Sequence, residues 1–230
     1  MRATYAVAGS KPWVHEIFHR HLARLPGRWH YLATPQQLTL RRLRQLAPRK
    51  VFFIHWSWKV DPAIVSQYEC VGFHMTNLPY GRGGSPLQHL ILRGHKQTQL
   101  TALRMTEEFD AGPVYAKQSL SLEGRAEDIY RRMSQEAAKM IAQFVRRQPA
   151  PVPQRGRGVR FVRRTPEESR IPTGQRLREL YDFIRMLDAP TYPRAFLDYA
   201  GLRFEFSHAA LQGRAVTARV RITAGKGRNP

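Results

Sequence analysis

Short apolar runs alternate with amphipathic stretches over the first two thirds of the chain. Runs such as residues 4–9 and 51–56 have the length and composition of buried strands. Other stretches place apolar residues every three or four positions, most regularly over residues 126–147. Strands that alternate with helices predict a mostly parallel sheet with helices on both faces, which is a Rossmann-like α/β fold.

The same pattern predicts the remaining elements. Further strands are expected at residues 29–33, 70–75, 100–105 and 113–122. Further helices are expected near residues 12–22, 34–46, 61–68, 86–93 and 172–187. A terminal hairpin is expected from strands 202–207 and 215–222, joined at Gly213.

A proline-rich segment at residues 148–153 predicts a domain boundary. We therefore expect a catalytic domain over residues 1–150 and a small C-terminal α+β extension, made of a helix and a hairpin, over residues 151–223. Residues 224–230 are expected to form a disordered tail.

Composition narrows the class of protein. The chain has 230 residues, of which 42% are hydrophobic, as in a globular protein. No apolar run has the length of a membrane span, and the first residues already have a strand pattern instead of a signal peptide. The single cysteine, Cys70, cannot form an internal disulfide, which fits a reducing, cytoplasmic environment.

The chain is strongly basic, with 38 Lys and Arg residues against 17 Asp and Glu residues and a net charge of +21. Such a charge is typical of proteins that meet nucleic acid, an anionic membrane surface or a phosphorylated substrate. The basic residues are spread along the chain, with small clusters such as residues 155–164. Scattered charge of this kind favours a solvated surface over a nucleic-acid interface, and codon bias is a further explanation.

Residues 70–112 carry the candidate chemistry. His74 lies at the end of one predicted strand, Asp110 follows the next, and a glycine-rich turn separates them. Because reacting groups gather at the carboxyl ends of strands in open α/β sheets, we expect His74 and Asp110 to form an acid–base pair. No GxSxG motif is present and Cys70 lies inside a strand, so a covalent intermediate is not favoured.

No metal site is expected. The one close group of histidines, at positions 15, 19 and 21, has no carboxylate or cysteine partner at the usual spacing.

An ordered set of motifs resembles the formyltransferases that use 10-formyltetrahydrofolate. The set consists of His74-Met-Thr-Asn-Leu-Pro79, Gly81-Arg-Gly83, Ser85-Pro86 and Asp110-Ala-Gly112. That family includes glycinamide ribonucleotide formyltransferase, methionyl-tRNA formyltransferase and the amino-sugar N-formyltransferases. The resemblance covers about residues 1–147 and implies the same Rossmann-like fold.

The resemblance implies a role for each catalytic candidate. His74 would stabilise the tetrahedral intermediate and shuttle protons, and Asp110 would orient His74 and assist proton transfer. The family asparagine, two residues before the histidine, is replaced here by Gly72. Asn77, three residues after His74, is the candidate substitute.

The resemblance also implies two binding regions. The pterin of the folate would lie against the strand end formed by His55, Trp56, Ser57 and Trp58, and against a loop that contains Thr106 and Phe109. The candidate residues for the acceptor are Tyr80, Arg82, Gly83, Arg163 and Arg164. The alternatives are that the tryptophans pack in the core and that Arg163 and Arg164 belong to a solvated linker.

The short extension favours one class of acceptor without excluding the others. It resembles that of the amino-sugar N-formyltransferases and is too small for the full β-barrel of methionyl-tRNA formyltransferases. The expected acceptor is therefore the amine of a nucleotide-linked amino sugar, and the family's habit of dimerising allows a homodimer. Two alternatives stay open: an aminoacyl-tRNA or other RNA-linked amine, and an inactive relative that only binds folate or a nucleotide.

Overall fold

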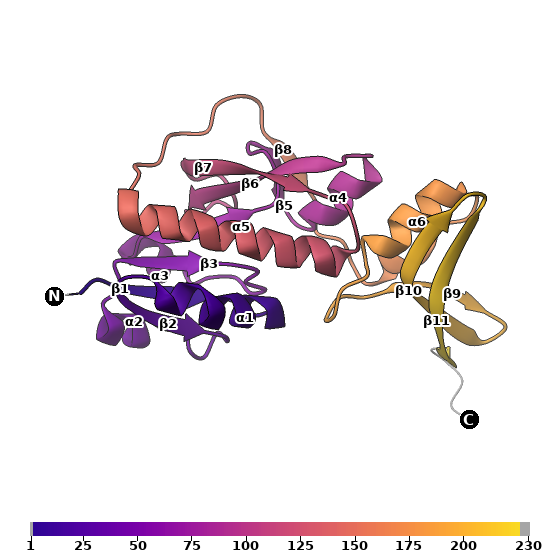
Figure 1. Cartoon of the computed structure of the whole chain (residues 1–230), viewed down its shortest axis with the longest axis horizontal. Helices are drawn as coiled ribbons and strands as arrows, with labels where there is room; N and C mark the ends of the chain where they lie inside the picture. Colours follow the sequence, from indigo (N-terminus) through magenta and orange to yellow (C-terminus); the bar gives the residue numbers. More distant parts are fainter. Residues whose placement is uncertain (1, 226–230) are drawn as a thin grey trace. The chain divides into compact units, whose positions relative to one another are not determined.

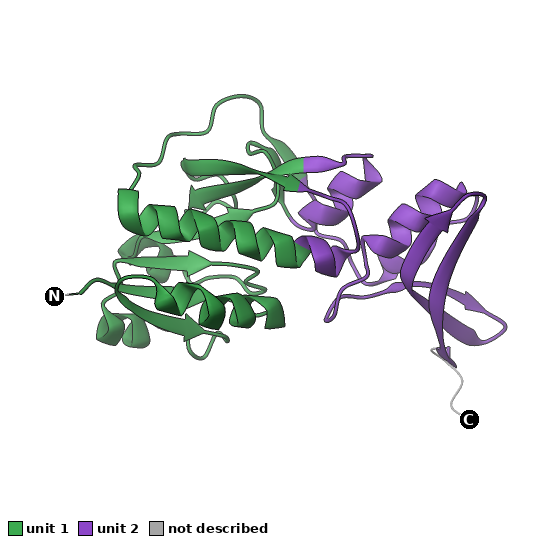
Figure 2. Ribbon diagram, viewed as in Figure 1, with its two compact units in different colours: residues 1–83, 98–120, 130–160 green, residues 84–97, 121–129, 161–230 purple. Residues whose placement is uncertain are grey.

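The computed structural model describes residues 2–225, which form two compact units (Figure 2). The first, called the sheet unit here, comprises residues 1–83, 98–120 and 130–160. The second, the extension unit, comprises residues 84–97, 121–129 and 161–230.

The sheet unit is built on a six-stranded sheet with the strand order β2-β1-β3-β4-β6-β7 (Figure 1). The strands are β1 (Thr4–Ala8), β2 (Arg28–Leu32), β3 (Lys50–Phe53), β4 (Cys70–His74), β6 (Gln97–Arg104) and β7 (Val114–Ser121). The pairs β1–β2, β1–β3 and β3–β4 are parallel, whereas β6 pairs with β4 in the antiparallel sense. The predicted mostly parallel sheet is confirmed, and the predicted strand 100–105 is its antiparallel member.

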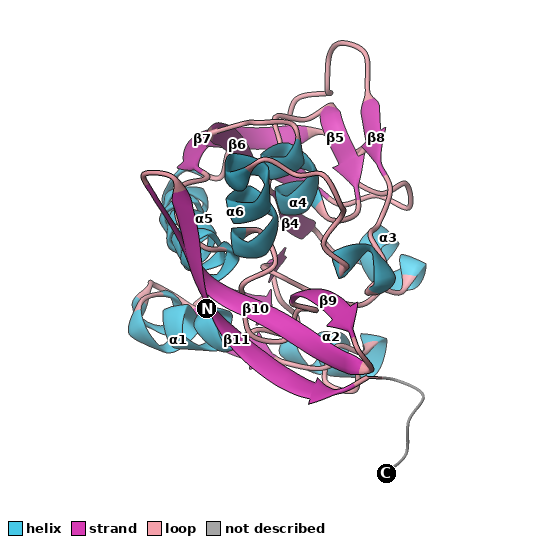
Figure 3. Ribbon diagram, turned by 90° about the vertical axis from the view of Figure 1, so that its right-hand side faces the viewer, coloured by secondary structure: helices cyan, strands magenta, loops and turns pink. Residues whose placement is uncertain are grey.

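Helices cover both faces of this sheet (Figure 3). On one face, α2 (Leu40–Leu46) and α3 (Pro62–Gln67) contribute Leu43 and Ile64 to a core that includes Phe53 and Cys70. The opposite face carries α1 (Pro12–Arg20) and α5 (Ala126–Arg147), and a short 3-10 helix, η1 (Leu22–Arg24), follows α1.

The helices α1 and α5 lie side by side. The ring of Trp13 stacks on the ring of Tyr130 with centroids 5.7 Å apart, and Arg131 Nη1 lies 2.9 Å from Glu16 Oε2. Apolar residues at helical spacing explain why α5 is the longest helix: Met133, Ala137 and others on its inner face are buried.

One predicted helix start is wrong. Residues 34–38 form a turn, and α2 begins only at Leu40. Thr39 is the residue that caps it, because its backbone is extended and its Oγ1 accepts a hydrogen bond from the N–H of Arg42 at 3.1 Å. Leu38, just before the cap, is buried in the core, which fixes where the helix can start.

The extension unit contains α4 (Pro86–Leu92), η2 (Glu167–Ser169), α6 (Leu177–Arg185), β9 (Ala195–Tyr199), β10 (Leu202–Gln212) and β11 (Ala215–Ala224). Its three strands form an antiparallel sheet in the order β11-β10-β9. The predicted hairpin is therefore present, with longer strands and with β9 as an unpredicted third strand. A separate two-stranded sheet joins β5 (Tyr80–Gly83) and β8 (Val159–Phe161).

The compact units do not follow the boundary expected near residue 150. Residues 84–97 and 121–129 group with the C-terminal part because side chains tie them to it: Gln88 Nε2 donates to Met186 O at 3.0 Å, and Arg185 Nη1 donates to Leu122 O at 2.7 Å. The predicted tail begins at Ala224, which is the last residue of β11, and residues 226–230 lie outside the described residues. Within residues 2–225, none of the helices combines the length and the apolar character that a membrane span requires.

The cap of α2 provides a test of this local structure. Substituting Thr39→Ala removes the side-chain acceptor for the Arg42 amide, so we expect the free energy of unfolding to fall by about 1 kcal/mol. Thr34→Ala is the matched control, because Thr34 precedes a turn and caps no helix. Urea denaturation of both variants checks this, and an equal loss in the two would contradict the assignment.

Candidate active site

His74 and Asp110 lie together at the end of β4. His74 is 8% exposed, and its Nδ1 lies 3.5 Å from Asp110 Oδ2. Its Nε2 lies 2.7 Å from the carbonyl oxygen of Gly81. Because a carbonyl only accepts hydrogen bonds, Nε2 must carry the donated proton. In the neutral ring, Nδ1 then presents its lone pair to the carboxylate, and a proton taken up at Nδ1 would form an ion pair with Asp110.

The route by which Asp110 reaches His74 differs from the expected one. Since β6 is antiparallel to β4, the carboxyl ends of these strands lie at opposite edges, with Arg104 level with Val71 and Thr101 level with His74. The strand-end argument for this pair was therefore wrong, although the pair itself is present. The loop after β6 makes the contact, and it folds back tightly: a Cβ on Gly112 would lie 1.8 Å from Arg104 O.

Strand β5, which contains Gly81, Arg82 and Gly83, holds both members of the pair from one side. Gly81 supplies the carbonyl that accepts from His74, and the N–H of Gly83 donates to Asp110 Oδ2 at 2.9 Å. Both glycines have positive φ, at 76° and 105°, where a side chain would be strained. The glycines flanking Arg82 therefore serve to aim one carbonyl and one N–H at the pair.

Gly72 and Asn77 occupy different environments. A Cβ on Gly72 would lie 3.3 Å from Met105 Cγ, so the Met105 side chain fills the space beside it. Asn77 is exposed, and its Oδ1 accepts a hydrogen bond from Lys117 Nζ at 2.6 Å. Its catalytic role stays a prediction, with its amide oxygen already engaged.

Lys117, on β7, is a residue that the sequence did not single out. It donates to both Asn77 and the carbonyl of Leu78, and burial lowers its pKa. In the sequence it is one polar position of an alternating strand, so no signal distinguished it.

His55 follows β3 and belongs to the core on the α1–α5 side. Its ring lies edge-on to Trp13 and Tyr130, with centroid distances of 5.7 Å and 4.9 Å. Burial, together with the charge of Lys11, lowers the pKa of His55 to about 3, and a backbone hydrogen bond to Tyr130 opposes this shift. At neutral pH the ring is therefore uncharged and serves as a packed wall.

The other expected folate residues divide into packed and accessible groups. Trp56 packs against the core, and Ser57 Oγ lies 2.8 Å from Ser10 Oγ. Trp58, whose ring centroid is 5.0 Å from that of Trp56, is 46% exposed, and Phe109 is 57% exposed. Thr106 Oγ1 donates to Glu108 O at 3.0 Å. The aromatic faces of Trp58 and Phe109 are thus the ones open to a flat ring such as a pterin, and to that extent these residues fit a folate.

The acceptor candidates fall in both units. Tyr80, Arg82 and Gly83 form β5 in the sheet unit. Arg163 and Arg164 belong to the extension unit, where a Cβ on Gly84 would lie 2.5 Å from Arg163 Cα.

Arg164 is held by contacts within its own unit. Its N–H donates to Ser85 Oγ at 3.0 Å, and its guanidinium lies 5.9 Å from the ring centroid of Phe183. Contact of either arginine with an acceptor stays a prediction.

The arrangement has close counterparts among known proteins. A solved methionyl-tRNA formyltransferase from Clostridium thermocellum is 36% identical, with a TM-score of 0.92, and the match covers 97% of this chain and 100% of that one. The chain belongs to the formyltransferase family. Residues 166–223 of this formyltransferase-family chain also match the family described as methionyl-tRNA formyltransferase, C-terminal domain.

Curated relatives of this family member are longer. The methionyl-tRNA formyltransferase of Rhizobium meliloti is 31% identical over 147 residues, which is 60% of this chain and 47% of the relative. The chain thus spans about half the length of the curated relatives it matches.

More distant structures share the fold alone. HypX from Aquifex aeolicus, solved with tetrahydrofolic acid, is 16% identical with a TM-score of 0.74 over 90% of this chain and 38% of that one. A sugar N-formyltransferase from Shewanella also shares the fold, at 12% identity and a TM-score of 0.70 over 92% of this chain and 99% of that one.

The buried His55 predicts a pH dependence of stability. An unfolded histidine takes up a proton near pH 6.5, whereas folded His55 resists protonation down to about pH 3. Its contribution to the free energy of unfolding should therefore fall as the pH drops below about 6.5, by about 2 kcal/mol at about pH 5.

Denaturation of the wild type and of His55→Gln at about pH 7.5 and about pH 5 checks this. We expect His55→Gln to be the less stable protein at the higher pH but to lose less stability on acidification. An equal loss in both proteins would contradict the assignment.

Proposed function

We propose that this chain transfers a formyl group from 10-formyltetrahydrofolate to the amine of an RNA-linked acceptor, as an aminoacyl-tRNA formyltransferase. The observation that carries the proposal is the pair formed by the buried His74 and the partly buried Asp110, held by Gly81 and Gly83 in a chain of this family. The pair joins a proton carrier to a fixed carboxylate, which is what an amine-to-formyl transfer needs.

In the proposed reaction the folate supplies the formyl carbon, which is bonded to N10. A bond forms between the acceptor nitrogen and this carbon, and the bond from the carbon to N10 breaks. The attacking amine must lose a proton and N10 must gain one, so the proton balance closes without a redox step. His74 Nδ1 can take the proton because the Asp110 carboxylate stabilises the resulting imidazolium, and the same pair can return it to the leaving nitrogen.

Charge developing on the formyl oxygen needs hydrogen-bond donors, and this is usually the largest catalytic contribution. Position 72 has no side chain to donate. Because the Nε2–H of His74 already donates to Gly81 O, the proposal assigns this task to backbone N–H groups of the surrounding segments and to the positive charge that His74 carries once its Nδ1 has taken up the proton. The exposed rings of Trp58 and Phe109 would receive the pterin.

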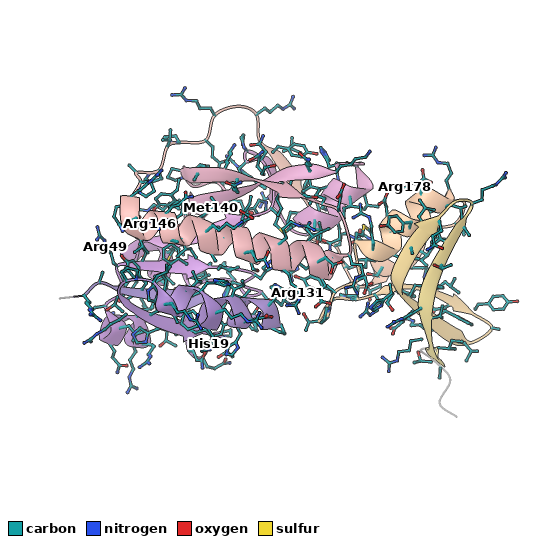
Figure 4. All side chains as sticks on the ribbon, viewed as in Figure 1. His19, Arg49, Arg131, Met140, Arg146 and Arg178 are labelled. Atoms are coloured by element: carbon teal, nitrogen blue, oxygen red, sulfur yellow. The ribbon has the colours of Figure 1, made fainter. Side chains whose placement is uncertain are left out.

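Two observations favour an RNA-linked acceptor over the amino sugar expected from the sequence. The solved relative that aligns over the whole chain, and the family matched by residues 166–223, are both methionyl-tRNA formyltransferases. The net charge of +21 also suits a polyanion, and exposed arginines such as Arg49 and Arg146 project from the sheet unit (Figure 4). An amino-sugar acceptor remains a second candidate, favoured by the extension unit having a three-stranded sheet instead of a barrel.

Loss of either member of the pair should remove the activity. His74→Ala and Asp110→Asn are each expected to lower turnover by about 100-fold or more, because proton transfer then lacks its carrier or its counter-charge. Release of tetrahydrofolate from 10-formyltetrahydrofolate, with methionyl-tRNA and a panel of amino-sugar nucleotides as acceptors, is the measurement.

His19→Ala, a change of an exposed histidine on α1, is the matched control and should retain wild-type turnover. Folate binding without turnover on any acceptor would support an inactive relative instead. Turnover with a sugar nucleotide and not with the tRNA would contradict the RNA-linked acceptor.

An RNA acceptor also predicts a salt dependence. Raising the salt concentration from about 50 mM to about 200 mM should raise the KM for the acceptor at least about tenfold, because phosphate contacts release counterions. The KM for 10-formyltetrahydrofolate should change far less, since a small co-substrate neutralises few charges. Steady-state kinetics at several salt concentrations tests this, and an acceptor KM that is insensitive to salt speaks against a polyanionic acceptor.

A further inference from the structure

Gln154 lies in the segment that follows α5 and makes four side-chain hydrogen bonds within the sheet unit. Its Oε1 accepts from Arg82 Nε at 3.1 Å and from Arg82 Nη2 at 2.8 Å. Its Nε2 donates to the carbonyls of Asp110 and Gly112, both at 2.8 Å. The amide therefore uses both of its N–H groups and accepts twice, so it has no donor left for a ligand.

We propose that Gln154 is a positioning residue that sets the distance between His74 and Asp110. This inference rests on the proposed formyl transfer for its catalytic consequence and on the hydrogen bonds themselves for its structural content. Nothing in the motif of the family resemblance includes position 154.

The Nε2 of the Gln154 side chain fixes the loop that carries Asp110. Asp110 has a φ of 55°, a left-handed conformation that a residue with a side chain holds only when its surroundings enforce it. Gln154 binds the carbonyls of residues 110 and 112, on both sides of Ala111. Removing these two donors should allow the loop to relax and the carboxylate to leave its place beside His74.

The Oε1 of Gln154 fixes strand β5 through Arg82. Arg82 is flanked by Gly81, which accepts from His74, and by Gly83, which donates to Asp110. The planar guanidinium offers Nε and Nη2 together to one oxygen, so a shift of either partner breaks a two-point contact. Gln154 therefore connects strand β5, whose backbone groups contact the catalytic pair, with the loop that carries Asp110.

The segment that carries Gln154 has a defined position in the sheet unit. Val152, two residues earlier, exchanges two backbone hydrogen bonds of 2.8 Å with Val114 at the start of β7. This bridge restricts where the segment can place the Gln154 side chain. The contact between His74 and Asp110, at 3.5 Å, is long for a hydrogen bond, so a small displacement of the loop would remove it.

The isosteric substitution Gln154→Glu separates these effects. The carboxylate keeps its interaction with Arg82 but turns an oxygen, in place of the N–H donors, toward the carbonyls of residues 110 and 112. We expect kcat to fall, by up to about 100-fold, with the KM values for folate and acceptor nearly unchanged, because the reacting groups and not the ligand contacts are displaced. Gln143→Glu, the same change at an exposed position of α5, is the matched control.

Two further measurements distinguish positioning from a loss of fold. Combined with Asp110→Asn, Gln154→Glu should cause little additional loss, because a residue that acts through Asp110 has nothing left to position. In the NMR spectrum of the free protein, the His74 ring and the Gly83 amide should shift in Gln154→Glu and stay in place in Gln143→Glu.

The outcomes separate this inference from the proposed function. A wild-type protein that formylates no acceptor overturns the proposed function, and the NMR comparison still decides whether Gln154 positions the pair. The inference is overturned if Gln154→Glu lowers kcat as much in the Asp110→Asn protein as in the wild type. It is also overturned if the NMR signals of His74 and Gly83 do not change. A Gln154→Glu enzyme that keeps kcat within about twofold of the wild type overturns it as well.

Discussion

The site depends on one constraint: the antiparallel pairing of β6 with β4 sends the chain away from His74, and Asp110 must be brought back. A strand-end aspartate would be placed by the sheet itself, but here the sheet places Arg104 beside Val71. The return is made by a loop whose tightest point, Gly112, allows no side chain against Arg104 O. The loop therefore has to be held by neighbouring residues. Gly83 and Gln154 hold it through hydrogen bonds to residues 110 and 112.

This arrangement explains why the residues around the His74–Asp110 pair have unusual backbone conformations. Gly81, Gly83 and Asp110 all have positive φ, and each presents a backbone or side-chain group to the pair. Such conformations cost free energy unless the surroundings fix them. The buried α/β core supplies that rigidity, since β4 has parallel β3 on one side, antiparallel β6 on the other and helices on both faces of the sheet.

The sequence was informative where periodicity or a motif carried the signal. The inner face of α5 and the order of strands and helices followed from the spacing of apolar residues. The proximity of Asp110 to His74 followed from the motif, whereas the strand-end argument for it was wrong. The direction of β6 did not follow, because an apolar run has the same pattern in either direction. The start of α2 was misplaced because Thr34 and Thr39 are both suitable cap residues, and only the folded structure shows that Thr39 takes this role.

Gln154 and Lys117 were missed for a different reason. Each acts through tertiary contacts that join distant segments, residue 154 to residues 82 and 110, and residue 117 to residue 77. A single Gln in a proline-rich segment has no local feature that marks it. Its significance appears only once the chain is folded and its two amide groups are seen to reach strand β5 and the loop that carries Asp110.

The environment of Gly72 shows that a departure from a motif has to be interpreted together with the tertiary contacts at that position. The absent side chain looks like the loss of one donor, yet Met105 and Leu103 would lie 3.3 Å and 3.6 Å from a Cβ at this position. A Cβ at this position would require the flexible Met105 side chain to shift by a few tenths of an ångström. Met105 begins the loop that carries Asp110, so position 72 packs directly against the start of this loop. The glycine at position 72 therefore leaves room for the present placement of the Met105 side chain.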